Sequence, residues 1–161
     1  MKRLACLGRS FLATVANERR RAHEPEVRIV IDPGRAKGAV MVRGHDSRLA
    51  QVFTNLLDNA RSFSPPDTIV TVSLKLVRDV VEVWVEDEGP GIPPHALERV
   101  FERFYTDRPH HGFGQNSGLG LSISRQILEA HGGTIRAENR GSDLAPEGAR
   151  FVVRLPYRPV T

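Results

Sequence analysis

The stretch WVEDEGPGI, residues 84–92, and the stretch GQNSGLGL, residues 114–121, decide how this chain is organised. In the first, the carboxylate of Asp87 ends an apolar strand pattern and is followed at once by Gly89 and Gly91. Such a carboxylate can accept a hydrogen bond from an exocyclic amine, and bare glycine backbone lets a flat ring approach closely. The second stretch opens a helix pattern, whose first N–H groups suit phosphate oxygens. Together they predict a nucleotide pocket, with the polar segment between them as a lid.

Composition sets the limits on the class of protein. The 161 residues, of which 40% are hydrophobic, are enough for one domain with a real core. Cys6 is the single cysteine, so a disulfide within the chain is excluded and a reducing compartment fits. The net charge of +4 is modest, and nucleic-acid binding is not expected. The first apolar run is interrupted at residues 8–10 and no stretch approaches the roughly 18 apolar residues of a membrane span, so we expect a cytoplasmic location without direct membrane contact.

Hydrophobic periodicity predicts the remaining elements. Apolar residues at helical spacing predict helices over 3–21, 47–62, 93–104 and 119–131, with Asp46 as the cap of the second. Alternating patterns predict strands over 27–31, 39–42, 68–76, 80–86, 134–137 and 150–155, the third and fourth forming an antiparallel hairpin. A polar loop containing Pro146 and Gly148 is expected between the last two strands. Trp84, Phe101 and Phe104 are expected in the core.

Two asparagines stand out in the helix predicted for 47–62. Asn55 and Asn59 lie one turn apart, both at the border of its apolar stripe. Asparagine has only moderate helix propensity, so two asparagines at the border of the apolar stripe are costly unless that border is hydrated or binds a ligand. Taken alone, Asn59 would more often be a surface amide and Asp87 a turn residue at the end of a strand. The two glycine-rich stretches favour a binding site instead.

Four segments resemble the N, G1, F and G2 boxes of the catalytic ATP-binding domain of bacterial sensor histidine kinases. In chain order they are NLLDNA (55–60), DEGPGI (87–92), FERFY (101–105) and GLGL (118–121). Their order and separations match the family, and the resemblance covers nearly the whole chain. It implies an α+β fold, shared with gyrase, chaperone and mismatch-repair ATPases, as a single domain over residues 1–161. That fold is a two-layer α/β sandwich with a mixed, mostly antiparallel sheet of about five strands, covered on one face by about three helices, and a mobile ATP lid at about 93–117.

The same resemblance implies a role for individual residues. Asn59 would be the side-chain ligand of Mg²⁺, a hard cation that takes oxygen ligands and keeps much of its hydration. Asn55 would lie near the metal or the phosphates, and both asparagines would be catalytic. Asp87 would accept the amino group of adenine. The other residues that would bind ATP are Gly89, Gly91, Ile92, Phe63, Tyr105, Gly118, Leu119, Gly120 and Leu121.

Two positions depart from the family pattern. Ser62 stands where family members commonly carry a lysine or arginine that reaches phosphate. Arg61 comes one place early, and a shift of about 100° around the helix leaves open whether it substitutes. The late glycine-x-glycine-threonine turn is reduced to PEGA at residues 146–149.

The resemblance implies transfer of the γ-phosphoryl group of ATP to a histidine in two-component signal transduction. The partners would be a histidine-bearing dimerisation domain and, indirectly, a response regulator. We expect that dimerisation domain to be absent from this chain, because HEP at residues 23–25 only faintly echoes its motif. The isolated chain is then expected to be monomeric and not to phosphorylate itself, and its parent protein to be anchored in the inner membrane.

Two alternatives remain. One is a nucleotide-binding regulatory module without phosphotransfer, in which the altered phosphate-contact positions leave only sensing. The other is a related ATP-hydrolysing member of the superfamily, which normally needs a catalytic glutamate where Asn55 stands, because an amide cannot activate a water nucleophile as a general base.

Overall fold

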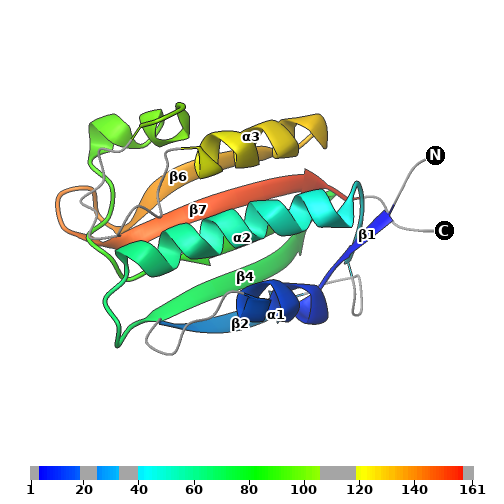
Figure 1. Ribbon diagram of the computed structural model, residues 1–161, viewed down its shortest axis with the longest axis horizontal. Coiled ribbons are helices and arrows are strands. Elements are labelled where there is room, and N and C mark those ends of the chain that lie inside the picture. The colour runs from blue at the N-terminus through cyan, green and yellow to red at the C-terminus, as the bar shows by residue number, and fades with distance from the viewer. Residues whose placement is uncertain (1–3, 19–24, 33–39, 106–118, 158–161) are drawn as a thin grey trace.

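The computed structural model describes residues 4–18, 25–32, 40–105 and 119–157, which form two layers. In Figure 1 the helices α1, α2 and α3 cover one face of a sheet, with α2 in the middle, α3 on one side of it and α1 on the other. The helices are α1 (Arg9–Glu18), α2 (Asp46–Phe63) and α3 (Gly120–Ala130). The sheet has the order β2-β4-β5-β7-β6, with β2 (Glu26–Asp32), β4 (Ile69–Val77), β5 (Val80–Glu86), β6 (Thr134–Gly141) and β7 (Pro146–Pro156). Among the described residues, no helix is both long and apolar enough to cross a membrane.

Strand direction agrees with the sequence prediction. β2 and β4 are parallel, whereas the pairs β4–β5, β5–β7 and β6–β7 are antiparallel. The predicted α+β sandwich with a mixed, mostly antiparallel sheet of five strands is therefore confirmed. A second sheet of two antiparallel strands, β1 (Leu4–Leu7) and β3 (Val40–Arg43), lies beside it.

The core lies between the helices and one face of the sheet. Alternate residues of β5 face the helices, where Val81, Val83 and Val85 are at most 1% exposed. The apolar stripe of α2 packs on them through buried residues that include Phe53 and Leu56. Fully burying a side chain of this size stabilises the fold by about 1.5–3 kcal/mol relative to leaving it exposed. α2 is therefore held firmly along its length, and the polar residues at its border have fixed positions.

The helix predicted for 3–21 is wrong in its first part. Residues Leu4–Leu7 form a strand in which Ala5 and Leu7 are buried, and the helix starts only at Arg9. A run of four residues is too short for its periodicity to separate strand from helix. Pairing with β3, which lies far along the chain, decides the outcome.

The start of α2 also differs from the prediction. His45 occupies the N-cap position, and Asp46 is the first helical residue, where its carboxylate accepts a hydrogen bond from the N–H of Ser47 at 2.9 Å. An acidic residue in the first turn still suits the positive end of the helix dipole. α2 ends at Phe63, just before a pair of prolines that cannot continue it.

The helix predicted for 93–104 is two short 3₁₀ turns, Pro94–Ala96 and Arg99–Phe101. Phe101 is buried against Phe151 in an edge-to-face contact, with ring centroids 6.1 Å apart. Phe104 is 66% exposed, so its prediction as a core residue is wrong. The backbone turns out of helical geometry at Glu102 and places Phe104 at a positive φ of 64°. The predicted lid continues over residues 106–118, which lie outside the described residues.

The loop predicted around Pro146 and Gly148 is a strand. β7 already begins at Pro146, and Pro146, Gly148 and Ala149 pair with β6. Proline is tolerated as the first residue of a strand, because its missing N–H leaves no ladder position unpaired there. An irregularity in the pairing at Arg140 and Gly141 accommodates the turn.

Trp84 lies on the face of the sheet opposite the helices and not in the core. Its neighbours Val83 and Val85 face the helices, so alternation turns Trp84 the other way. Its ring is sandwiched between Lys75 and Arg150, whose cationic groups are 4.7 and 4.3 Å from the ring centroid. A period-two sequence pattern predicts a strand whose side chains alternate between the two faces of the sheet. It does not show which face the helices cover.

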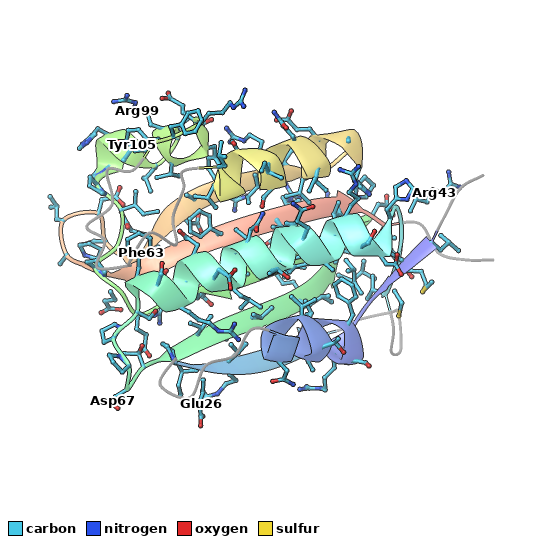
Figure 2. The ribbon with its side chains drawn as sticks, in the orientation of Figure 1. Glu26, Arg43, Phe63, Asp67, Arg99 and Tyr105 are labelled. Atoms are coloured by element: carbon cyan, nitrogen blue, oxygen red, sulfur yellow. The ribbon has the colours of Figure 1, made fainter. Side chains whose placement is uncertain are left out.

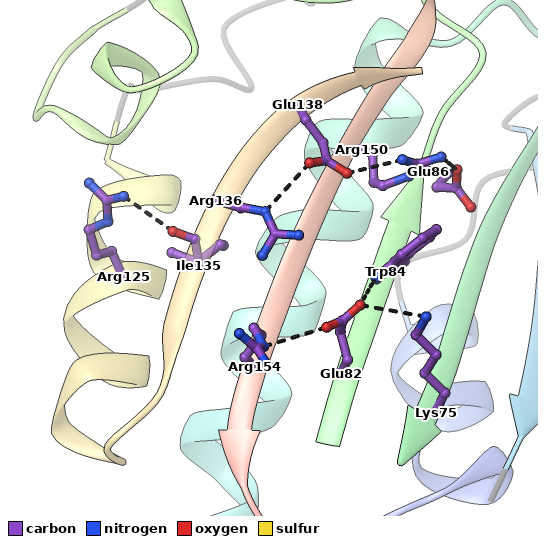
Figure 3. Close-up of polar contacts among 10 residues, drawn as sticks. All are labelled: Lys75, Glu82, Trp84, Glu86, Arg125, Ile135, Arg136, Glu138, Arg150 and Arg154. Carbon is purple, nitrogen blue, oxygen red and sulfur yellow. Dashed lines mark hydrogen bonds and ion pairs between the residues drawn. The ribbon is translucent and has the colours of Figure 1, made fainter. Parts of the chain in front are cut away.

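Charged residues surround Trp84 on this face, as Figure 3 shows. Glu82 accepts a hydrogen bond from the Trp84 indole and pairs with Lys75 and Arg154, at 3.8 and 3.4 Å. Arg150 pairs with Glu86 and Glu138 at 2.9 and 3.0 Å. Burial lowers the pKa of Arg150, but the hydrogen bonds and charges of the two glutamates outweigh burial and raise the pKa above its ordinary value. The network fixes the end of β5, from which Asp87 follows.

Candidate functional site

Three elements meet around one side of α2. Asn55 lies beside the start of α3, where its amide nitrogen donates to the carbonyl oxygen of Gly120 at 3.2 Å. Phe63, labelled in Figure 2, is the last residue of α2 and lies against the loop of residues 87–92, which follows β5. The approach is so close that a Cβ on Gly89 would lie 2.5 Å from the carbonyl oxygen of Phe63. The structure therefore places the first glycine box and the described part of the second, at Gly120, next to the N-box helix α2.

Asp87 is held rigidly at the end of the sheet. It is 1% exposed, and its Oδ1 accepts hydrogen bonds from the N–H groups of Gly89 at 2.9 Å and Ala149 at 3.0 Å. Its own N–H donates to the carbonyl oxygen of Ala149 at 3.0 Å. Hydrogen bonds of this kind are what a buried carboxylate requires. Its orientation is therefore set by the backbone of the loop and of β7.

Gly148 is needed for this arrangement. It has a φ of +142°, and a Cβ at this position would lie 1.9 Å from the carbonyl oxygen of Asp87. Gly91 is also required, because it has a φ of +81° and a Cβ there would lie 2.5 Å from the Cβ of Pro146. The PEGA segment at the start of β7 thus still supplies the glycine and the close contacts that support the loop carrying Asp87.

Three further residues fasten the loop from outside. Arg140 donates to the carbonyl oxygen of Asp87 at 3.0 Å, and the carboxylate of Glu88 accepts from the N–H of Ile69 at 2.7 Å. The side chain of Asn139 is hydrogen-bonded to the backbone of Ile92. Sequence reasoning did not identify Asn139 or Arg140. Both lie beyond the strand predicted for 134–137, in the stretch expected to be a polar loop, where an asparagine is ordinary and gives no signal.

Asn59 and Asn55 have different surroundings. Asn59 is 8% exposed, and its Nδ2 has no hydrogen-bond partner among the described residues. The Nδ2 of Asn55 donates both to Gly120 and to the hydroxyl of Ser124, at 3.2 and 3.3 Å. Asn55 therefore holds the start of α3 against α2, whereas the Asn59 amide carries unused hydrogen-bonding capacity within the described part of the chain.

Of the remaining predicted residues, Tyr105, Leu119 and Leu121 are among those that the structure describes. Tyr105 packs partly buried against the core, with the guanidinium of Arg99 4.7 Å from its ring centroid. Leu119 immediately precedes α3, and its carbonyl oxygen accepts from the N–H of Ile123 at 2.9 Å. Leu121 packs partly buried against the core, and Gly118 lies outside the described residues.

Arg61 serves a different part of the molecule. It is 7% exposed, and its guanidinium donates to the carbonyl oxygen of Ala16 in α1. It also lines a cavity of about 120 Å³ between α1 and β2. α1 and α3 lie on opposite sides of α2 in Figure 1. The guanidinium is therefore directed away from the side of α2 that Asn55 presents to α3, and Arg61 does not take over the position of Ser62.

Known proteins resemble both the sequence and the fold. Residues 44–159 match the family model described as histidine kinase-, DNA gyrase B-, and HSP90-like ATPase. The sensor protein ChvG of Rhizobium meliloti is 55% identical over 126 residues, which are 76% of this chain and 22% of that protein. The signal transduction histidine-protein kinase/phosphatase MprB of Mycobacterium sp. (strain KMS) is 43% identical over 121 residues, 74% of this chain and 23% of that protein. The chain thus spans about a fifth of the length of these curated relatives.

Solved structures of histidine kinases resemble this chain in fold. The mycobacterial sensor histidine kinase MprB matches with a TM-score of 0.81 at 30% identity, covering 99% of this chain and 100% of that one. The catalytic domain of histidine kinase ThkA matches with a TM-score of 0.77 at 27% identity, covering 96% of each chain. The chain therefore belongs to the family of histidine kinase-, DNA gyrase B- and HSP90-like ATPases, as an ATP-binding catalytic domain of the sensor histidine kinase type.

Proposed function

We propose that this domain binds ATP with Mg²⁺ and transfers the γ-phosphoryl group to a histidine on a separate helical dimerisation domain. The observation that carries the proposal is the buried carboxylate of Asp87, fixed by two backbone N–H groups beside the end of α2. The same helix carries Asn59, and Asn55 joins it to the start of α3. One surface of α2 would then serve both ends of the nucleotide.

The base of the nucleotide would be selected by the loop of residues 87–92. Asp87 is a hydrogen-bond acceptor, and its partner would be the exocyclic amine of adenine. Gly89 and Gly91 keep the loop free of side chains, and the ring of Phe63 would pack near the base together with Ile92 and Tyr105. Base recognition by one buried charged acceptor is worth about 1.5–3 kcal/mol.

The phosphates would be bound at the other end. α3 has 11 residues, and the N–H groups of its first turn lack partners within the helix. Gly118, Leu119, Gly120 and Leu121 would form the backbone around them.

A Mg²⁺ ion would be held by Asn59. Its amide oxygen, Oδ1, is a neutral donor of the kind that a hard cation takes. The described residues contain no group of three or more histidine, cysteine, aspartate or glutamate side chains able to hold a metal. As the family resemblance implies, the other ligands would be phosphate and water oxygens. When bound, Mg²⁺ neutralises phosphate charge during transfer.

The contribution of this chain to the reaction would be positioning. Phosphoryl transfer passes through a loose transition state, so orienting the donor and neutralising its charge account for most of the catalysis. Asp87 would fix the base, and Asn59 and the start of α3 would fix the phosphates. The acceptor nitrogen would come from the partner histidine. Asn55 carries no carboxylate that could activate water, which favours transfer over hydrolysis.

The setting is part of the same proposal. The named relatives are sensor proteins and histidine kinases, which supports a two-component pathway. The direct partner would be a dimerisation domain bearing the acceptor histidine, and a response regulator would receive the phosphoryl group from it. The domain itself would act on the cytoplasmic side of the membrane, as a monomer when isolated.

The test is phosphotransfer in a mixture. The chain would be incubated with γ-labelled ATP, Mg²⁺ and a dimeric helical hairpin bearing the acceptor histidine. We expect acid-labile, base-stable label on the hairpin and none on the chain alone. A hairpin with glutamine in place of the acceptor histidine, and the Asn59→Ala chain, should both abolish the label. ATP binding without transfer to any hairpin would favour the regulatory-module alternative, and label on the isolated chain would contradict the proposal.

A further inference from the structure

Asn139 pairs with the backbone of the nucleotide loop in the manner of a strand. The N–H of Ile92 donates to Oδ1 of Asn139 at 2.7 Å, and Nδ2 of Asn139 donates to the carbonyl oxygen of Ile92 at 2.8 Å. A primary amide offers a donor and an acceptor side by side, so it can satisfy both backbone groups of one residue at once. Asn139 belongs to β6, which β7 separates from β5 in the sheet, and it lies 47 residues along the chain from Ile92.

The orientation of the amide is determined by its surroundings. Besides Ile92, Nδ2 donates to the carboxylate of Asp143 at 3.0 Å. Reversing the amide would place its oxygen against both the carbonyl oxygen of Ile92 and the carboxylate of Asp143. Nδ2 therefore faces the two acceptors, and Oδ1 faces the single donor.

This pairing fastens one end of the loop. Ile92 is 1% exposed, and its backbone groups are costly to bury without partners. A Cβ on Gly91 would lie 2.8 Å from Oδ1 of Asn139, so the loop passes directly over the amide. The other end is fastened where Asp87 pairs with Ala149. The segment between these two points has its path set from both sides.

We propose that Asn139 is a positioning residue for recognition of the base. By fixing Ile92 and Gly91, its amide holds the loop in the path that presents the carboxylate of Asp87 to the exocyclic amine of adenine. The inference rests on the proposed function, since it assigns a supporting residue to the same nucleotide site. Asn139 acts through the loop and has no contact with the nucleotide in this proposal.

The experiment compares two nucleotides on three proteins. Calorimetric titrations with Mg²⁺ measure the affinity for ATP and for purine riboside triphosphate, which lacks the 6-amino group. The unmodified chain should prefer ATP by about tenfold or more, because only ATP offers a donor to Asp87. In Asn139→Ala the preference should fall to about threefold or less. Asp143→Ala is the matched control: it removes the outer partner of the same amide, leaves both bonds to Ile92, and should keep the preference within about twofold of that of the unmodified chain.

Each outcome decides something. An equal loss of affinity for both nucleotides in Asn139→Ala, or an unchanged preference, would assign the residue a general structural role and overturn the inference. Absence of binding of either nucleotide to the folded, unmodified chain would overturn the proposed function itself. Native-state hydrogen exchange gives a second readout that does not depend on folding of the variant. The Ile92 amide of the unmodified chain should exchange at least about 100-fold more slowly than an unprotected amide, and fast exchange would overturn the inference.

Discussion

Replacing Asn59 with leucine should stabilise the nucleotide-free domain and remove its response to Mg²⁺. Asn59 lies at the edge of the packed face of α2, and its Nδ2 exposes less than 1 Å² without a hydrogen-bond partner among the described residues. Leucine has the same branching as asparagine but no polar atoms. The substitution therefore removes a buried donor that nothing described satisfies and fills the same space.

The magnitude follows from the burial of the amide. An unsatisfied buried polar group costs about 1–3 kcal/mol. The side chain keeps 8% exposure, so the lower part of that range, about 1–2 kcal/mol, applies. For a domain of this size each kcal/mol moves the melting temperature by roughly 2–4 °C. Asn59→Leu should therefore raise the melting temperature by roughly 2–8 °C.

Asn55→Leu is the matched control, with the same substitution one turn earlier on the same helix. Here the amide has partners, so its removal leaves the carbonyl oxygen of Gly120 and the fully buried hydroxyl of Ser124 without this donor. The expected effect has the opposite sign, a loss of about 1–3 kcal/mol.

Thermal unfolding followed by circular dichroism measures both variants, each with and without ATP and Mg²⁺. The unmodified chain should gain stability from the added ligands in proportion to its affinity, and Asn59→Leu should lose the part of the gain that depends on Mg²⁺. A fall in melting temperature for Asn59→Leu, equal to that of Asn55→Leu, would refute the reasoning. It would mean that the Asn59 amide is satisfied without ligand.

Three other substitutions test separate features of the site. Gly148→Ala should abolish ATP binding and lower stability, as judged by calorimetry and thermal unfolding, because its Cβ would lie 1.9 Å from the carbonyl oxygen of Asp87. Arg61→Leu should lower the free energy of unfolding, measured by denaturant titration, by about 1–3 kcal/mol, because the guanidinium donates to α1. The dissociation constant for ATP should not change, and weaker ATP binding would indicate that Arg61 contacts phosphate. Ser62→Lys should tighten ATP by roughly twofold to fivefold and leave adenosine unaffected, as expected for one partly exposed ion pair to phosphate; equal effects on both ligands would argue against a phosphate contact.

Much of the fold could be predicted because a long periodic pattern of apolar residues distinguishes a helix from a strand. The stripe of α2 and the alternation of β4 and β5 each extend over several repeats. Short segments failed where tertiary contacts decide. Leu4–Leu7 is a strand because it pairs with β3. Pro146 belongs to β7 because it pairs with β6. Trp84 shows a third limit: the period-two strand was predicted correctly, but Trp84 was expected in the core and lies on the face of the sheet opposite the helices.

The sequence offered candidate site residues where short motifs concentrate the chemistry. Asp87, Gly89 and Asn55 were proposed in this way, and the structure brings the elements that carry them together. The residues that support them were not identified. Asn139 and Arg140 act through hydrogen bonds to the backbone of the loop, and which backbone groups a strand side chain meets depends on the register of β6 against β7.

The most direct single measurement is calorimetric titration of ATP, with Mg²⁺ present, into the unmodified chain and into Asp87→Asn. The asparagine oxygen can still accept from the two N–H groups that hold Asp87, so the loop should keep its path. The variant replaces a charged acceptor with an amide, which should cost about 1.5–3 kcal/mol, or roughly one to two decades in the dissociation constant for ATP. Mg²⁺-dependent binding that weakens by this amount is the expected result. Equal affinities for the two proteins would contradict recognition of adenine by Asp87.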